Sequence, residues 1–239
     1  MNSQTTPTIH GFLERKKILL LILQKNISGQ DYQFDEHEAL IFDLDVSIRF
    51  AQKFITLPDK KIIVSNKYPK LNIHYSKGIA AIGAPINYDL LEIKVENDLK
   101  LGLWGTSVWN IETGLFLNTH HMEFIDYKHF NTNASVFTGF QDDYFELLDY
   151  YYYSTNGHWI EGHFTHHFNG FLFNKLPLLR KSKVQAIASL HYLHTDSINN
   201  YLELGVGIEH IFKLFRVDYF NSIMEGKHQS QGIRLGLGF

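Results

Sequence analysis

Apolar and polar residues alternate along several long segments of the chain, beginning near residue 38. In the first segment the apolar set is Leu40, Phe42, Leu44, Val46, Ile48 and Phe50. The positions between them include Asp43, Asp45 and Arg49. A period of two places successive side chains on opposite faces of a β-strand. The pattern therefore predicts strands with one apolar and one charged face.

Similar alternations run through residues 91–101, 184–192 and 202–208. We count about ten strands of this kind, many near ten residues long, whereas five or six residues are typical of globular strands. The pair Asn156-Gly157 predicts a two-residue hairpin. After Ile208 the apolar set moves to odd positions beginning at Phe215, which predicts a bulge or tight connection near residues 210–214.

The first 35 residues show neither strand alternation nor a convincing helical cap. We therefore expect an irregular segment over 1–35, followed by one β-barrel region over 36–239. The run Ile18 to Leu23 is apolar but falls short of the roughly 18 residues of a membrane-spanning helix. A signal peptide needs an apolar run of about 7–15 residues and a small-residue cleavage site. On this evidence either the chain is not exported or its N-terminal part is missing from this sequence.

The composition is rich in aromatic residues and argues against several classes of function. The 239 residues include 13 Tyr, 19 Phe and 3 Trp, or 15% of the chain, at an ordinary hydrophobic content of 44%. A net charge of -3 gives no electrostatic reason to expect nucleic acid. The chain has no cysteine, which excludes disulfides and thiolate metal sites.

Two environments suit strands with unlike faces. A soluble barrel or sandwich turns its apolar face inward and can bind an apolar ligand there. An outer-membrane barrel turns the apolar face to lipid and the charged face to its lumen. Strand length, aromatic residues such as Trp104 and the run Tyr150 to Tyr153 near strand ends, and a final phenylalanine favour the membrane.

Three motifs resemble one known family. They are HHFNGFLFNKLPLLRK at 166–181, YLELGVGIEHIFKLFRVDY at 201–219 and GIRLGLGF at 232–239, and residues 55–79 also fit. The family is a large Bacteroidota outer-membrane family of unestablished function, whose members carry an N-terminal carboxypeptidase-regulatory-like domain before a β-barrel. The resemblance covers most of residues 35–239. Family members are several times longer, which suggests that this chain is truncated.

The resemblance implies an outer-membrane protein in contact with lipid, and it gives the C-terminal strand a role. The β-barrel assembly machinery would read that strand as a sorting signal by strand addition. Its apolar face is Ile233, Leu235, Leu237 and Phe239. In such a barrel the charges that point into the lumen are Asp43, Asp45, Arg49, Glu203, Glu209, Arg216 and Asp218. We interpret these charges as structural support.

The sequence favours a protein that is not an enzyme and holds no cofactor. Fourteen histidines invite a metal site. The pair His120-His121, however, points to opposite faces of a strand, and His163 and His167 lie about 13 Å apart along one. Ser189 and His191 share a face, as a barrel-embedded lipid hydrolase would require, and this is the weaker alternative.

The expected fold is all-β: an antiparallel transmembrane β-barrel of the outer-membrane type with about ten strands, incomplete and open. A larger family barrel leaves the first strand, near residues 38–50, and the strand ending at Phe239 without partners. Unpaired edges cost several kcal/mol per backbone group in lipid. We therefore expect aggregation when the chain is expressed alone.

The facing of the strand near residues 38–50 generates a prediction. An arginine in place of Leu44, near the middle of the strand, should lower the free energy of unfolding in a bilayer by about 2–4 kcal/mol, because its charge would enter hydrocarbon. Denaturant unfolding in lipid vesicles measures this difference. The side chains expected to face lipid are Leu40, Phe42, Leu44, Val46 and Ile48, and finding these packed in a central core would contradict the prediction.

Overall fold

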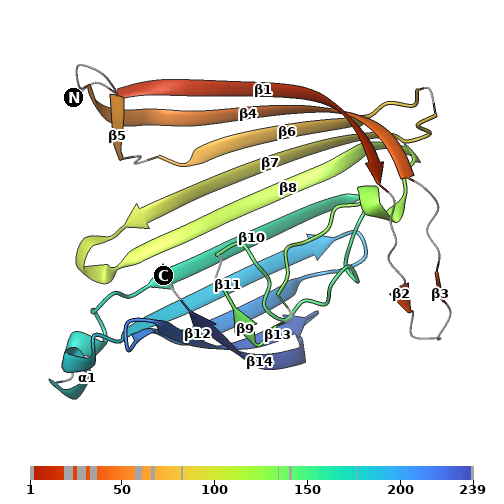
Figure 1. The fold of residues 1–239 in the computed structure, drawn as a ribbon. Helices are drawn as coiled ribbons and strands as arrows, with labels where there is room; N and C mark the ends of the chain where they lie inside the picture. Colours follow the sequence, from red (N-terminus) through yellow and green to blue (C-terminus); the bar gives the residue numbers. More distant parts are fainter. Residues whose placement is uncertain are drawn as a thin grey trace.

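The computed structural model describes residues 3–18, 24–25, 31–32, 37–56, 61–65, 68–81, 83–133, 135–139, 142–175 and 177–237. Ten long antiparallel strands form one curved sheet in chain order (Figure 1). They are β1 (Ser3–Ile18), β4 (His37–Thr56), β6 (Lys70–Gly78), β7 (Asn87–Lys100), β8 (Thr106–His121), β10 (His158–His167), β11 (Gln185–Thr195), β12 (Tyr201–Ile211), β13 (Phe215–Met224) and β14 (Lys227–Leu237).

The remaining elements are short. Strand β5 (Lys61–Ser65) pairs with β4, β9 (Phe137–Thr138) pairs in parallel with β14, and β2 (Gln24–Lys25) pairs with β3 (Asp31–Tyr32). The helical turns are η1 (Gly102–Trp104), η2 (Phe124–Asp126), η3 (Phe173–Lys175) and α1 (Pro177–Ser182). Of the helices that the structure describes, none has the length and apolar character needed to cross a membrane.

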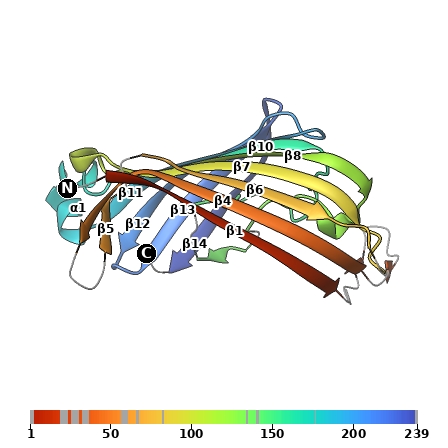
Figure 2. The same cartoon turned by 90° about the horizontal axis from the view of Figure 1, so that it is seen from above.

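The strands lie side by side in one curved layer, with α1 at one end (Figure 2). The face on the inside of the curve is called the concave face below, and the other the convex face. The connection between β8 and β10, residues 122–157, lies against the concave face (Figure 1). We call it the inner segment. Its 36 residues are far more than the two to five of an ordinary hairpin loop.

A soluble barrel buries its apolar side chains, whereas this sheet buries many polar side chains on the concave face and exposes apolar ones on the convex face. On β12 the convex-facing Val206 is 62% exposed, while Glu203 on the concave face is 0% exposed. Across the sheet the buried polar residues include Glu161, His163, Thr165, Ser189, His191, Asp218 and Ser222. The exposed apolar residues include Ile93, Ile111, Leu115, Phe164, Leu190, Leu204, Ile208 and Ile233. The alternation in the sequence thus becomes an interior that holds many polar side chains and an apolar exterior.

An aromatic cluster fills one part of the interior. It contains Phe130, Phe145 and Leu148 from the inner segment together with Trp159 and Tyr201 from the sheet. The rings of Phe116 and Trp159 lie 5.9 Å apart between centroids, close enough for a favourable tilted contact. The inner segment is therefore held by apolar burial as well as by polar bonds.

The connection between β12 and β13 has the predicted shape. The ladder shifts register between Ile208 and Ile211, and His210, Phe212 and Lys213 have positive φ angles. Positive φ is uncommon outside glycine and marks a tight turn. The prediction from the shifted apolar phase is confirmed.

Two other predictions are wrong. The segment expected to be irregular contains β1, which pairs with β4 from Ser3↔Lys53 to Ile18↔His37. Pro7 and the run of charges at 14–17 hide its period of two, and pairing with a neighbouring strand needs only the backbone. The Asn156-Gly157 hairpin is also absent from the described residues: these two residues precede β10, and Thr155 forms its bridge with Lys128 in the inner segment.

The sheet is open, as expected. The described ladder runs from β1 at one edge to β14 and the two-residue β9 at the other. The free first edge is β1, however, and the expectation that residues 38–50 would form it is wrong, since β4 pairs with both β1 and β6. Strand β14 meets β9 only at Leu235↔Phe137 and Gly236↔Thr138.

The packing of Trp159 against β8 generates a prediction. A Cβ at Gly114 would overlap the Trp159 ring, so Gly114→Ala should lower the free energy of unfolding by about 1–3 kcal/mol. The matched control is Gly162→Ala on the neighbouring strand, where the nearest atom to a Cβ is 3.8 Å away. The control should leave that free energy unchanged or raise it by up to about 1 kcal/mol. Urea unfolding of both variants in detergent measures the difference, and equal effects would refute the packing argument.

Candidate functional site on the concave face

The inner segment has a small framework of its own. Lys128 and Thr155 form an antiparallel bridge with N···O distances of 2.9 and 3.1 Å, and Thr132 and Phe145 form a parallel one. These bridges bring the two halves of the segment together. As a result its polar and aromatic side chains are presented to the sheet as one unit.

Lys128 binds three carboxylates from three neighbouring strands. Its Nζ lies 3.0 Å from Glu92 Oε1 on β7 and 3.6 Å from Glu161 Oε1 on β10, and it also donates to Glu112 on β8. The ammonium lies 5.2 Å from the centroid of the Trp159 ring. Burial opposes the charge on this lysine, but the three carboxylates outweigh burial and raise the pKa of Lys128.

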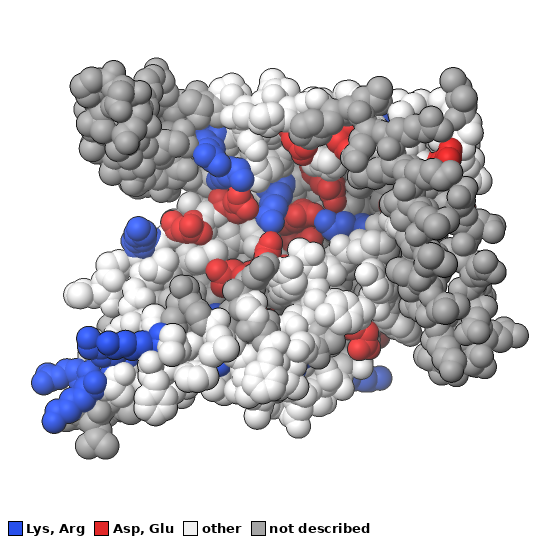
Figure 3. All heavy atoms as spheres, in the orientation of Figure 1, with Lys and Arg blue, Asp and Glu red and all other residues white. Residues whose placement is uncertain are grey.

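A ladder of charges continues from this cluster towards β4. His74 Nδ1 lies 2.7 Å from Asp45 Oδ1, and its Nε2 lies 3.9 Å from Asp43. Lys70 donates to Glu96 at 2.6 Å. Figure 3 shows acidic and basic side chains gathered in the hollow between the upper and lower strands. The two signs are interspersed, and carboxylates outnumber lysines among these contacts.

Glu203 anchors the inner segment to β12. Its carboxylate accepts the backbone N–H groups of Glu146 at 2.8 Å and Leu147 at 2.9 Å, and the Tyr201 hydroxyl at 2.6 Å. Three donors on one buried carboxylate satisfy most of its hydrogen-bonding capacity. The sheet thus binds the main chain of the segment through two backbone N–H groups, which every residue except proline can supply at 146 and 147.

Arg234 on β14 provides a second anchor. Its Nε lies 3.4 Å from Glu146 Oε2, and its Nη2 donates to the backbone oxygens of Glu146 and Asn133. Asn133 Nδ2 in turn donates to Glu146 Oε2 at 3.1 Å. Burial raises the pKa of Glu146 to about 7, although Arg234 opposes the shift.

Phe145 occupies the space in front of two histidines. Its ring centroid lies 4.7 Å from that of His163 and 6.1 Å from that of His191. The two Nδ1 atoms are 2.8 Å apart, so one ring donates and the other accepts a single shared proton. Ser189, the partner imagined for a hydrolase, bonds instead with the Thr165 hydroxyl at 3.5 Å.

The charged residues predicted to point into the lumen differ in burial and in their partners. Glu209 accepts from His167 Nδ1 at 3.0 Å, and Arg216 Nε donates to Asp218 at 2.6 Å, all on the concave face. Asp43, Asp45 and Glu203 have the contacts given above. Arg49 is exposed, opposite Lys70 in the ladder.

The predicted sorting strand is β14. Its Ile233 and Leu237 are exposed and Leu235 is half-buried, while Phe239 lies outside the described residues.

Sequence reasoning missed Lys128, Glu146 and Arg234 as a group. The first two lie in a connection without periodicity, and the third was one polar position among glycines. The available signal was the length of the connection, because loops beyond about 12–15 residues are usually functional or disordered. Within the described part of the chain, no group of three His, Asp or Glu side chains is arranged to hold a metal ion.

A family profile matches residues 23–208 and is described as the C-terminal domain of DUF5686, a family of unknown function. The chain belongs to this family. Searches of curated proteins and of solved structures found no match. The DUF5686 match includes Lys128, Glu146 and Glu203, and Arg234 lies beyond it. It agrees with the C-terminal part of the resemblance, while the N-terminal carboxypeptidase-regulatory-like domain and the Bacteroidota origin stay predictions.

The Lys128 cluster generates a prediction. Replacing Lys128 with Met leaves Glu92, Glu112 and Glu161 without their shared cation, and this should lower the free energy of unfolding by about 3–5 kcal/mol. The control is Lys70→Met, because the Lys70–Glu96 pair is more exposed and should contribute about 0–1 kcal/mol. Urea unfolding in detergent gives both values. Equal losses would show that Lys128 does not hold the inner segment to the sheet.

Proposed function

We propose that this chain is an integral outer-membrane β-protein, non-enzymatic, whose convex face contacts lipid. The observation that carries the proposal is the reversed facing of the sheet, with carboxylates and histidines buried on the concave side and apolar side chains exposed on the convex side. In water such a sheet would leave a large apolar surface exposed, which soluble monomers rarely do. In a membrane the same surface is solvated by acyl chains.

The soluble alternative requires the opposite arrangement. A barrel or sandwich that binds an apolar ligand needs an apolar interior. Here the interior contains Glu203, Asp218 and the Lys128 cluster, and the aromatic cluster inside is already packed with the inner segment. This arrangement disfavours an internal apolar ligand.

The inner segment bears on the role within the membrane. Two separate anchors, at Glu203 and Arg234, bind the backbone of Glu146. The proposed role is therefore in assembly or surface architecture, or in transport that first releases this segment, rather than in free passage of solutes through an open pore. The weaker alternative, a lipid hydrolase at Ser189 and His191, has Phe145 packed in front of its histidine.

The proposed partner is the β-barrel assembly machinery, which would bind at the C-terminal strand. Most of one edge of β14 is unpaired within the described residues, and its convex side chains are apolar. An exposed strand edge is a template for strand addition.

Cysteine labelling tests the proposal, since the chain has no cysteine of its own. The test variant is Val206→Cys, in the middle of β12 on the convex face, where the native side chain is 62% exposed. The control is Leu103→Cys in the short turn η1, where the native side chain is 88% exposed. Both are treated with a sulfonated maleimide in isolated membranes and again in denaturant.

The proposal predicts that the cysteine at 206 reacts only after denaturation, because lipid excludes the charged reagent, while the one at 103 reacts in both conditions. The native protein should also require detergent for extraction and migrate differently on a gel before and after heating. Equal labelling of both sites without denaturant, with the protein in the high-speed supernatant, would support a soluble β-protein instead.

A further inference from the structure

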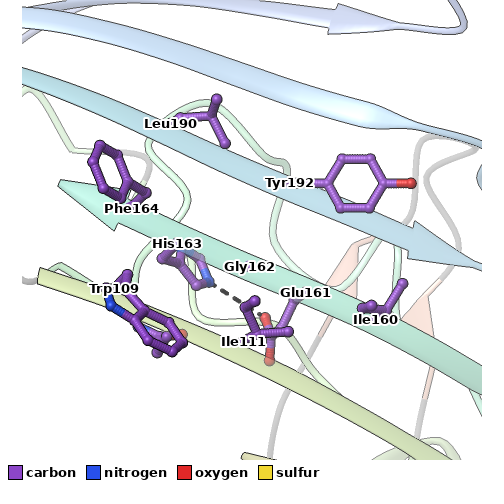
Figure 4. Close-up of a pocket in the computed structure, with 10 residues that line it drawn as sticks. Trp109, Ile111, Ile160, Glu161, Gly162, His163, Phe164, Leu190 and Tyr192 are labelled. Carbon is purple, nitrogen blue, oxygen red and sulfur yellow. Dashed lines mark ion pairs between the residues drawn. The ribbon is translucent and has the colours of Figure 1, made fainter. Parts of the chain in front are cut away.

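The convex face carries a shallow apolar groove of about 380 Å³. Figure 4 shows it at Gly162 on β10, between side chains of β8 and β11. Its walls are Trp109, Ile111, Ile160, Phe164, Leu190 and Tyr192. The neighbouring Glu161 and His163 point their side chains to the concave face, where they are buried. The groove is therefore apolar along its walls.

Gly162 creates this groove by lacking a side chain. It lies opposite Ile111 on one side and Tyr192 on the other. A Cβ there would meet no atom closer than 3.8 Å, and the φ angle is not in the left-handed region. Neither crowding nor backbone conformation requires glycine at this position. Its effect is to leave open space between Ile160 and Phe164, the large side chains on either side of it on the convex face of β10.

A basic connection lies at the end of the same two strands. Between β10 and β11 the exposed cations are Lys175, Arg180, Lys181 and Lys183. None of the four has a carboxylate partner among the described residues. Figure 3 shows basic side chains clustered at the lower left, where Figure 1 places α1.

Aromatic rings lie beside these cations. The centroids of Trp104 and Phe171 are 4.6 Å apart, and Lys175 Nζ lies 4.4 Å from the Phe171 centroid. Aromatic and basic side chains together are typical of the level of lipid head groups.

The distance between the groove and the connection fits one molecule. Five residues separate Gly162 from the end of β10 at His167, or about 17 Å at 3.3 Å per residue. Half of the hydrocarbon core is about 15 Å thick. The convex positions of β11 between the groove and the basic connection are Ala186 and Ala188, whose small side chains leave room for an acyl chain.

We propose that the groove and the basic connection form one binding site for an anionic glycerophospholipid. One acyl chain lies over Gly162, and the phosphate head group lies among Lys175, Arg180 and Lys181. The inference rests on the proposed function, because the convex face must be in a bilayer. A free phosphate ion would leave the groove empty, and a zwitterionic lipid would bring no net charge to the cations.

The test uses the full chain in phosphatidylcholine nanodiscs, into which dibromo-acyl phosphatidylglycerol or dibromo-acyl phosphatidylcholine is mixed. Bromine quenches tryptophan fluorescence on contact, and Trp109 lines the groove. Phosphatidylglycerol should quench at a mole fraction at least about tenfold lower than phosphatidylcholine, since each basic residue near the head group favours the anionic lipid. The preferential signal should disappear in Trp109→Phe.

Two sets of variants separate the parts of the site. Gly162→Val fills the groove and should abolish the preference, and Gly162→Ala should reduce it with less risk to folding. Arg180→Glu with Lys181→Glu should bring phosphatidylglycerol to the level of phosphatidylcholine. The matched controls are Lys227→Glu at the opposite end of the sheet and Val206→Ile on the convex face outside the groove. Both controls should behave as the native chain.

Equal quenching by the two lipids, or full preference in both Gly162 variants, would overturn the inference. Displacement of phosphatidylglycerol by glycerol phosphate would also overturn it and indicate a free phosphate site. If neither lipid quenches Trp109 at any mole fraction, the convex face is not in lipid and the proposed function fails. Quenching by both lipids without preference leaves the proposed function intact and rejects only this site.

Discussion

The shared ion pair of Lys128 with Glu92, Glu112 and Glu161 is the interaction on which the rest of the interior depends. Three carboxylates on adjacent strands would repel one another, and their burial without a cation would cost several kcal/mol. The lysine comes from the inner segment, so the sheet and the segment need each other. The same logic holds at Glu203, whose buried carboxylate is satisfied by backbone N–H groups of that segment.

This mutual requirement explains why a polar face can be an interior. Soluble barrels bury apolar side chains because water is outside. Here the inner segment supplies hydrogen-bond donors, acceptors and a cation to the concave face, so that its polar groups are buried with partners. Under the proposed function, lipid would solvate the exposed apolar side chains of the convex face without any change in the strands.

The edges of the sheet set the remaining constraint. Within the described residues β1 and most of β14 have one free side each. In the proposed membrane setting, the backbone groups on these free sides would need partners. Strand β9 shows how part of this need is met, since the inner segment returns to pair with β14 at two residues. The segment that covers the concave face thus also covers part of an edge. The family profile matches residues 23–208, which include most of the long strands but neither of the edge strands β1 and β14.

The sequence by itself determined the strands with a clear period of two, among them β4, β7, β11 and β12, and also the irregular turn before β13. These follow from sequence because the face on which a side chain lies depends only on its position along its own strand. The strand β1 was missed because charged residues and a proline obscure its period, and its backbone is ordered by pairing with β4. Only the tertiary structure brought Lys128, Glu146 and Arg234 to the concave face. Their partners lie on strands distant in sequence, and no local pattern encodes a contact that exists only after the sheet has curved around the inner segment.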